Sequence, residues 1–222
     1  MVGFLRDELI KALEDYKYLL TRGYNQKPSL DLVTSRYRLS KPERMLLFRC
    51  IHSDSDVVEV YNKTVTPSQI CSQRLVIDGF NTLLTITSVL EGDYVYLCDD
   101  GFVRDLRSSK IKDFEIEGIK ASATTLMRYL KLLKPSDTVL ILDKQVSKSG
   151  ELKNGLSEIL TNIKVLLASK ADITVLTEEG VISSSDFLIL KKASKVFDMA
   201  GYIIMNEFRH RIIDLNKILR DR

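Results

Sequence analysis

The sequence predicts an α/β protein, with a Rossmann-like parallel sheet covered by helices on both faces over residues 70–222 and a small all-α domain over residues 1–55. From Arg74 onward, short runs rich in β-branched residues alternate with amphipathic helical stretches. This is the pattern of a parallel sheet that is buried on both faces. In the first 52 residues, apolar side chains recur at helical spacings and are separated by capping signals.

The N-terminal part is expected to form three helices. Leucines recur at spacings of three and four between Leu5 and Leu20, and Gly23 stands where a C-cap glycine belongs. Ser29 is the expected cap of a second, short helix. The tetrapeptide Ser40-Lys41-Pro42-Glu43 forms a capping box with proline in the first turn, so a third helix should run on through Ile51.

Four apolar runs of strand length are expected to form the parallel sheet, with helices between them. The expected strands are 75–77, 94–97, 139–142 and 173–176, and the expected helices are 80–91, 118–134 and 150–169. The C-terminal part is expected to add short strands at 196–197 and 212–213, and helices near 186–194, 199–206 and 214–221.

The composition argues against several classes of protein. No apolar run approaches the roughly 20 residues that cross a bilayer, and the N-terminus lacks a signal-peptide pattern, so we expect a cytoplasmic protein without membrane contact. Three cysteines without a CxxC pair argue against a disulfide framework and a zinc site. Two isolated histidines argue against a His-rich metal site and a Ser-His-Asp hydrolase.

The charge is distributed unevenly along the chain. The formal net charge is +3, but residues 1–52 carry ten Lys and Arg against six Asp and Glu, and the remainder carries 23 against 24. We expect the basic helical part to hold RNA or, alternatively, single-stranded DNA. Arg36 and Arg38, which flank Tyr37, are candidate contacts because arginines and aromatics stack on unpaired bases. The alternatives are a solvated helix surface and a packed hinge between the two domains. A homodimer is also compatible with the sequence.

Three of the four expected strands end in aspartate. Asp78 follows the first strand, Asp99 and Asp100 follow the second, and Asp143 follows the third. Ligands of open α/β sheets bind at the carboxyl ends of the strands, so these carboxylates should converge. Clustered carboxylates are costly unless a cation neutralises them, and oxygen ligands suit Mg²⁺ or Mn²⁺. The alternative is that single aspartates only cap the following helices.

Other polar residues near these aspartates are candidates for substrate binding. Arg104 is expected either to contact phosphate or to pair with the neighbouring carboxylates. Ser147, Lys148 and Ser149 open an expected helix, whose N-terminal N–H groups and dipole favour an anion. An ordinary capped helix start is the alternative. Asp172 is excluded from the site because it precedes its expected strand.

The segment RLVIDGFNTLL at 74–84 resembles the first strand of PIN-like nucleases, especially their NYN branch, which carries an Asp-Gly-x-Asn signature there. This resemblance implies a Rossmann-like sheet whose acidic residues hold Mg²⁺ or Mn²⁺ for RNA cleavage. It matches Asp78 to the first metal-binding carboxylate, Asn81 to its supporting asparagine and Asp143 to the central acidic residue. Asp186 then matches the acidic residue after the fourth strand, and Asp99 or Asp100 would supply a further ligand.

Nearly the whole chain also resembles an uncharacterised archaeal-type family that joins a short helical N-terminal domain to a PIN-like domain. The segments that carry this resemblance are TRGY at 21–24, SRYRLSKPERMLLFR at 35–49, LCDDGFVRDLR at 97–107 and DKQVSKSGEL at 143–152.

The leading hypothesis is therefore a metal-dependent nuclease, in particular a ribonuclease, with Asp78, Asp143 and Asp100 as catalytic residues. The alternative is a non-catalytic module that binds RNA or a nucleotide at the same edge of the sheet. A phosphatase of the haloacid-dehalogenase type would use Asp78 as its nucleophile. That chemistry requires Asp-x-Asp, and Phe80 occupies the second position.

Overall fold

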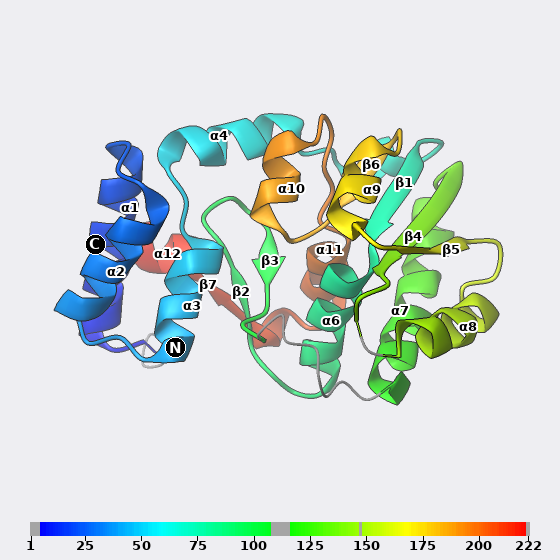
Figure 1. The fold of residues 1–222 in the computed structure, drawn as a ribbon, viewed down its shortest axis with the longest axis horizontal. Helices are drawn as coiled ribbons and strands as arrows, with labels where there is room; N and C mark the ends of the chain where they lie inside the picture. Colours follow the sequence, from blue (N-terminus) through cyan, green and yellow to red (C-terminus); the bar gives the residue numbers. More distant parts are fainter. Residues whose placement is uncertain (1–4, 108–115, 147, 221–222) are drawn as a thin grey trace.

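The N-terminal part of the protein is helical and is followed by an α/β domain (Figure 1). The structure, a computed structural model, describes residues 5–107, 116–146 and 148–220. The helical region consists of α1 (Asp7–Thr21), α2 (Gln26–Arg36), α3 (Lys41–Cys50) and α4 (Asp54–Lys63). A short helix, α5 (Pro67–Ile70), leads into the α/β domain.

Two of the three predicted helix signals in the helical region are confirmed. Gly23 follows α1 with a φ of +83°, a left-handed conformation that glycine adopts without steric cost. At α3 the Ser40 hydroxyl accepts from the backbone N–H of Glu43, and the Glu43 carboxylate accepts from the backbone N–H of Ser40. The expected cap at Ser29 is wrong. The helix α2 begins at Gln26 with Asn25 as its N-cap, a residue type as favourable there as serine, and Ser29 is buried within the helix.

The α/β domain contains a four-stranded sheet in which all neighbouring strands are parallel. Its strands are β1 (Arg74–Asp78), β4 (Asp137–Asp143), β5 (Lys164–Ala168) and β6 (Val181–Ser183), in the spatial order β5-β4-β1-β6. The helices of the domain are α6 (Gly79–Leu90), α7 (Ile116–Leu133), α8 (Ser149–Ile159), α9 (Ala171–Thr177), α10 (Phe187–Lys192) and α11 (Met199–Glu207).

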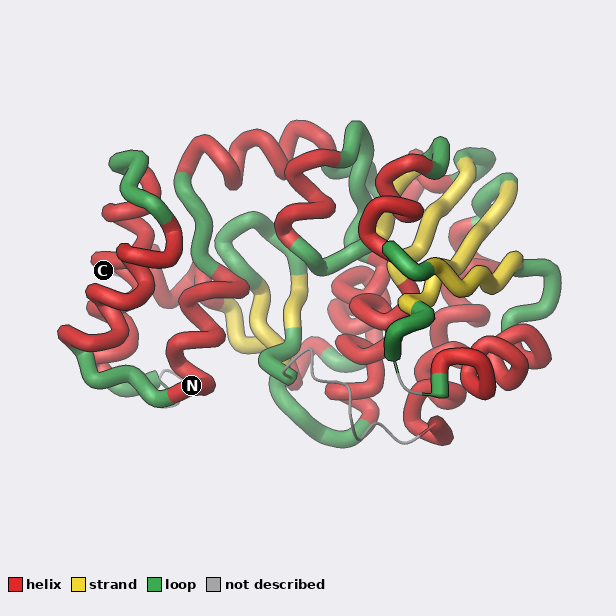
Figure 2. The backbone as a smooth tube through the Cα atoms, viewed as in Figure 1, coloured by secondary structure: helices red, strands yellow, loops and turns green. Residues whose placement is uncertain are grey.

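Helices cover both faces of this sheet, as predicted (Figure 2). Leu75 and Ile77 of β1 belong to a core that also contains side chains of α6, α7, α8 and α11. Val76, between them, points to the other face and packs with side chains of α9 and α10. This alternation follows from the two-residue period of a strand, and the near-continuous apolar run reflects burial on both sides.

The predicted strand at 94–97 exists, but its expected place in the parallel sheet is wrong. It forms β2 (Val95–Leu97) of a separate three-stranded sheet with β3 (Val103–Arg104) and β7 (Ile212–Asp214). β2 pairs antiparallel with β3 and parallel with β7, which includes the predicted strand at 212–213. Local sequence pattern does not encode the pairing partner, which is decided by contacts between distant segments.

Two further expectations fail in the C-terminal half. The run at 173–176 is helical and belongs to α9, and the fourth strand of the sheet is β6. The helix expected at 150–169 ends at Ile159, and β5 occupies 164–168. Short apolar runs of this kind fit a strand or a buried helix equally well, so tertiary contacts decide between them. Val196 forms only isolated bridges, to Thr64 and Ile182.

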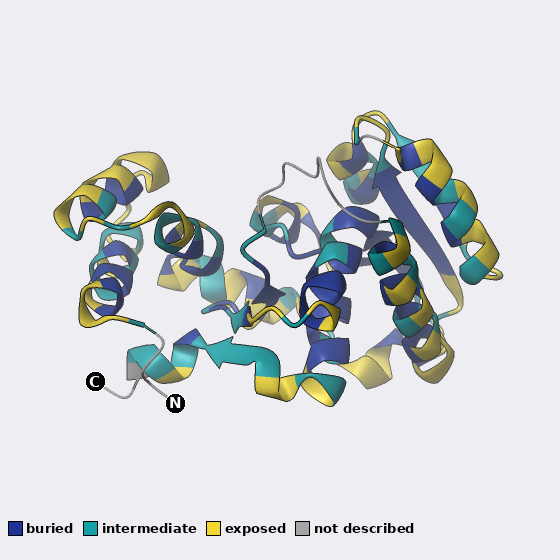
Figure 3. Cartoon of the chain, turned by 90° about the horizontal axis from the view of Figure 1, so that it is seen from below, coloured by how far each residue is buried: buried dark blue, intermediate teal, exposed yellow. Residues whose placement is uncertain are grey.

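The end of the described chain returns to the helical region. The 3₁₀ turn Arg209–Arg211 precedes β7, and the helix α12 (Leu215–Arg220) follows that strand. This helix packs against α1 (Figure 1). Leu215 and Cys98, which follows β2, are buried in the core of the helical region. Figure 3 shows buried segments in dark blue in both the helical region and the α/β domain. The small sheet therefore joins the helical region to the α/β domain. Among the described helices, none is both long and apolar enough to cross a membrane.

Candidate functional site

The carboxyl edge of the parallel sheet borders a cavity of about 340 Å³, which we name the acidic pocket. One aspartate after each of the four strands lines it: Asp78 at the end of β1, Asp143 at the end of β4, Asp172 after β5, and Asp186 after β6. The chain leaves β1 toward α6 on one face and leaves β6 toward α10 on the other. Such a reversal opens a crevice at the carboxyl ends of parallel strands.

Asp78 is the most buried of these four aspartates, with 5% of its surface exposed. Its Oδ2 atom accepts hydrogen bonds from the Asn81 side-chain amide at 2.6 Å and from the Ser184 hydroxyl at 2.7 Å. Burial raises the pKa of Asp78 to about 6, the two hydrogen bonds oppose this rise, and the charges of Asp172 and Asp186 add to it. Its position and orientation are thus defined by β1, α6 and the segment after β6.

Among the other three carboxylates, Asp172 lies within electrostatic range of both Asp143 and Asp186. Partial burial raises the pKa of Asp172, and the charges of Asp186 and Asp143 raise it further. Asp143 accepts from the backbone N–H of Gln145, and Asp186 accepts from the backbone N–H of Leu188 as the N-cap of α10. The neighbouring carboxylates thus disfavour the charged forms of Asp78 and Asp172, and a bound cation would oppose that effect.

Gly79 allows β1 and α6 to approach β4 closely. A Cβ atom at this position would lie 2.7 Å from Leu140 and from Leu142, and 2.9 Å from the backbone oxygen of Ile141. The glycine of the Asp-Gly-x-Asn segment is therefore required by packing, because the start of α6 lies directly against β4. This close approach brings the carboxyl ends of β1 and β4, and with them Asp78 and Asp143, to the same pocket.

A wall of the acidic pocket is basic and partly apolar, and the helical region supplies much of it. Arg49, Met45 and Phe48 of α3 line the pocket, together with Asp105 and Arg107 from the segment after β3. Arg49 donates to Asp105 at 3.4 Å and to the backbone oxygen of Arg107 at 3.3 Å. Asp105 also accepts from the Thr85 hydroxyl at 2.8 Å, so its charge is compensated locally. Arg49 and Arg107 thus line the same cavity as the four strand-end carboxylates, and Arg107 also forms ion pairs with Glu91 and Asp93.

The structure does not bring Asp99, Asp100 or Arg104 to the acidic pocket, contrary to the sequence-based expectation. They follow β2 or lie in β3, and so they belong to the small sheet. Asp100 and Arg104 form a buried ion pair, with Arg104 Nη1 and Nη2 donating to the two Asp100 oxygens at 2.8 and 2.5 Å. Because the Arg104 side chain is 1% exposed, it does not offer a guanidinium group to a phosphate.

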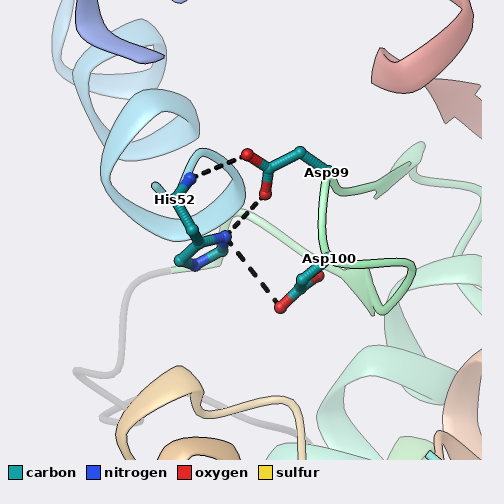
Figure 4. A group of neighbouring side chains, drawn as sticks. All are labelled: His52, Asp99 and Asp100. Carbon is teal, nitrogen blue, oxygen red and sulfur yellow. Dashed lines mark hydrogen bonds and ion pairs between the residues drawn. The ribbon is translucent and has the colours of Figure 1, made fainter. Parts of the chain in front are cut away.

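His52, Asp99 and Asp100 form the one group of three in the described residues whose ligand atoms lie within 4.8 Å of one another, a spacing that could hold a metal ion (Figure 4). His52 Nδ1 lies 2.7 Å from Asp99 Oδ1 and 3.9 Å from Asp100 Oδ2. The two carboxylates also have cationic partners, since Lys17 contacts Asp99 at 3.0 Å and Arg104 contacts Asp100. These contacts favour a structural role, because they tie α1 and the end of α3 to the turn after β2.

The remaining residues predicted to bind substrate lie away from the pocket lining. Arg36 is exposed beside Asp15 and over the ring of Tyr37, and Arg38 is exposed at a φ of 49°. Lys148 is the N-cap of α8 at a φ of 60°, and the buried Ser149 hydroxyl donates to the backbone oxygen of Lys144. Ser147 lies outside the described residues.

Sequence reasoning missed Asp172, Arg49 and Asp105 as residues of the pocket. Asp172 was excluded because 173–176 reads as a strand, whereas it lies in the first turn of α9, at the carboxyl end of β5. The signal that could have found it is the apolar run within 164–168, which can be read as a strand that ends four residues before Asp172. No local signal identifies Arg49, because its place depends on how α3 packs against the α/β domain.

Comparisons with known proteins identify related families. Residues 67–202 match the family described as "Domain of unknown function (DUF5616)", and residues 8–63 match "Protein of unknown function (DUF434)". An uncharacterized protein of Methanocaldococcus jannaschii is 33% identical over 187 residues, which cover 82% of this chain and 88% of that protein. No solved structure matches the chain significantly. The two matched segments correspond to the helical region and to most of the α/β domain.

Proposed function

We propose that this chain, which belongs to the DUF5616 family, is a divalent-metal-dependent nuclease that cleaves RNA at the acidic pocket. The observation that carries the proposal is the convergence of Asp78, Asp143, Asp172 and Asp186, one after each parallel strand, on a cavity that two guanidinium groups also line. The resemblance of the segment around Asp78 to PIN-like nucleases agrees with this proposal.

The pocket offers the type of donor that Mg²⁺ or Mn²⁺ prefers, and no three of its four strand-end aspartates, all of them described residues, have ligand atoms within 4.8 Å of one another, so a bound ion would draw them closer. Both hydrogen bonds to Asp78 engage Oδ2, so Oδ1 is available as a ligand among the described contacts. Asp143, Asp172 and Asp186 add carboxylate oxygens, and hard cations of this class prefer oxygen ligands. When bound, the metal supplies charge stabilisation for a phosphodiester and lowers the pKa of a coordinated water.

Side chains of the pocket, together with water, supply the remaining roles in the reaction. Arg49 and Arg107 would contact the phosphate oxygens while sharing their guanidinium groups with their present partners, Asp105 for Arg49 and Glu91 and Asp93 for Arg107. Asn81 and Ser184 keep Asp78 oriented. The water oxygen bonds to phosphorus while the bond from phosphorus to the leaving nucleotide oxygen breaks. The proton lost by water passes to a pocket carboxylate or to solvent, and the leaving oxygen takes a proton from solvent. The atoms balance with water as the second substrate.

The test is the cleavage of end-labelled single-stranded RNA by the full chain, with Mn²⁺, with Mg²⁺ and with a chelator. The matched pair of variants is Asp143→Asn and Asp137→Asn, because these residues lie at opposite ends of the same strand, β4. Asp137 is exposed and pairs with Arg74, away from the acidic pocket. We expect Asp143→Asn to cleave RNA at least about 100-fold more slowly than the wild type, because about 100-fold is the upper range for changes to groups that only support a metal ligand. Asp137→Asn should cleave at the wild-type rate.

Mn²⁺ binding, measured by electron paramagnetic resonance, provides a second readout. Asp78→Asn and Asp143→Asn should weaken binding, whereas Asp137→Asn should not. Equal cleavage by all variants, or cleavage that survives the chelator, would refute the proposal. A chain that binds RNA with no turnover and no dependence on metal would instead be a non-catalytic binding module. A parallel reaction with single-stranded DNA tells whether the 2′-hydroxyl is required.

A further inference from the structure

A second cavity, of about 480 Å³, lies between α2 and α3 and adjoins the acidic pocket. We name it the strand groove. It is lined by the apolar side chains of Leu30, Met45 and Phe48, by the basic side chains of Lys27, Lys41 and Arg44, and by Gln26. Of the described residues, those that line it include no carboxylate.

The strand groove shares two lining residues with the acidic pocket. Met45 and Phe48, one turn apart on α3, line both cavities. Figure 1 shows α3 between α2 and the strands β2 and β3 of the small sheet. A chain molecule that leaves the acidic pocket along α3 therefore passes over Phe48 and enters the groove. Phe48 is 46% exposed, although it is a large apolar side chain on a packed helix.

The three basic side chains that line the groove differ in whether they already have hydrogen-bond or ion-pair partners. Arg44 is held in place, because it donates to Asp31 at 2.6 Å and to the Thr34 hydroxyl at 3.1 Å. Lys27 and Lys41 are exposed, and neither has an ion-pair or hydrogen-bond partner among the described residues. Two free ammonium groups beside an exposed aromatic ring offer the two contacts that single-stranded nucleic acids make: phosphates with cations and bases with aromatic faces.

We infer that the strand groove binds single-stranded RNA that runs on from the acidic pocket, with a base stacked on Phe48 and phosphates held by Lys27 and Lys41. The inference rests on the proposed nuclease function, and it adds how the substrate is recognised. Double-stranded RNA is excluded as the occupant, because a paired base does not present its face to a side chain. The groove contacts differ from the expected ones, since Arg36 and Arg38 do not line it.

The test measures binding of a fluorescent single-stranded RNA oligomer to the full chain by anisotropy, in a chelator, where the proposed hydrolysis does not proceed. Phe48→Ala should weaken binding about 5- to 140-fold, the range for loss of one base stacked on an aromatic ring. Phe48→Trp should restore it. The control Tyr61→Ala removes a more exposed aromatic ring from α4 and should leave the affinity unchanged.

The contribution of charge is tested with the double variant Lys27→Glu/Lys41→Glu. The slope of log affinity against log salt concentration should fall in magnitude by at least about 1.4, which is two phosphate contacts at about 0.7 each for single strands. The charge-matched control is Lys11→Glu/Arg36→Glu, which changes two exposed basic residues of the same helical region outside the groove. Circular dichroism verifies that each variant is folded.

The outcomes separate this inference from the proposed function. If both groove variants bind RNA as the wild type does, the inference that the strand groove binds RNA is refuted. The same holds if the control variants lose as much affinity as the groove variants. Neither result bears on cleavage at the acidic pocket. If RNA binding depends on the groove but no cleavage occurs with any divalent metal, the nuclease proposal alone is refuted. Tighter binding of a duplex than of the single strand would also refute the groove.

Discussion

The buried ion pair between Arg104 and Asp100 allows a prediction whose magnitude follows from the structure. The Arg104 side chain is 1% exposed, and that of Asp100 is fully buried. Arg104 donates three hydrogen bonds, two to Asp100 and one, at 2.6 Å, to the backbone oxygen of Ser185. Arg104→Met keeps much of the volume but leaves a buried carboxylate and a backbone oxygen without these donors. Removing one partner of a buried pair costs about 3–5 kcal/mol of unfolding free energy.

The unfolding free energy lost in Arg104→Met should depend on pH, because the variant changes the titration of Asp100. Burial by itself would raise the pKa of Asp100, but the charge and hydrogen bonds of Arg104 outweigh it and lower the pKa. Without Arg104, burial dominates, and the folded-state pKa rises above the unfolded value. The variant then loses stability as pH rises through its raised folded-state pKa, so its deficit is larger at about pH 7.5 than at about pH 4.5.

Urea unfolding followed by circular dichroism at both pH values measures these differences. The companion variant Asp100→Leu/Arg104→Met replaces the pair by apolar side chains and should recover much of the loss, because no buried charge remains. An Arg104→Met variant within about 1 kcal/mol of the wild type at both pH values would refute the reasoning, since buried pairs are expected to cost more than that when broken. A double variant no more stable than the single one would refute it as well.

Two more predictions concern stability. Asp198, the N-cap of α11, is buried, and burial raises its pKa from 3.8 to about 6 despite hydrogen bonds from Val103 and Gly201. The protonated form therefore stabilises the fold below about pH 4, and this stabilisation is lost as pH rises through about 6. Over that window the unfolding free energy of the wild type, relative to Asp198→Asn, should fall by about 3 kcal/mol. Urea unfolding measures this difference, and a difference that stays constant with pH would contradict the prediction. Gly79→Ala should destabilise the protein by about 1–3 kcal/mol through its contacts with β4, and an unchanged thermal midpoint would argue against the close approach.

Arg104 shows how far a sequence pattern reaches and where it stops. Its spacing from Asp100 is compatible with an ion pair and with phosphate contact, and both remained open in the sequence. The structure decides for the ion pair because β3 is buried beneath the segment that carries Ser185. Burial depends on which segments pack together, and the pattern around residue 104 contains no information on that.

The aspartates near the ends of apolar runs show the same difference between what the sequence pattern determines and what tertiary structure decides. Asp78 and Asp143 each end an apolar run, and the parallel arrangement of β1 and β4 brings the two carboxylates to the same pocket. Asp99 and Asp100 also end an apolar run, yet β2 pairs with β3 and β7 and leads them elsewhere. Asp172 looked misplaced only because a short apolar run was read as a strand when it forms a helix.

The sequence by itself determined the α/β class, the preceding helices, the capping box at Ser40 and the aspartates that end β1 and β4. These features depend on periodicity and on contacts between residues a few positions apart, which the linear order contains. Tertiary structure alone decided which strands share a sheet, that Arg49 and Phe48 reach the acidic pocket, and that the strand groove adjoins it. These depend on the packing of segments far apart in the chain, where burial of apolar surface selects among arrangements that are locally equivalent.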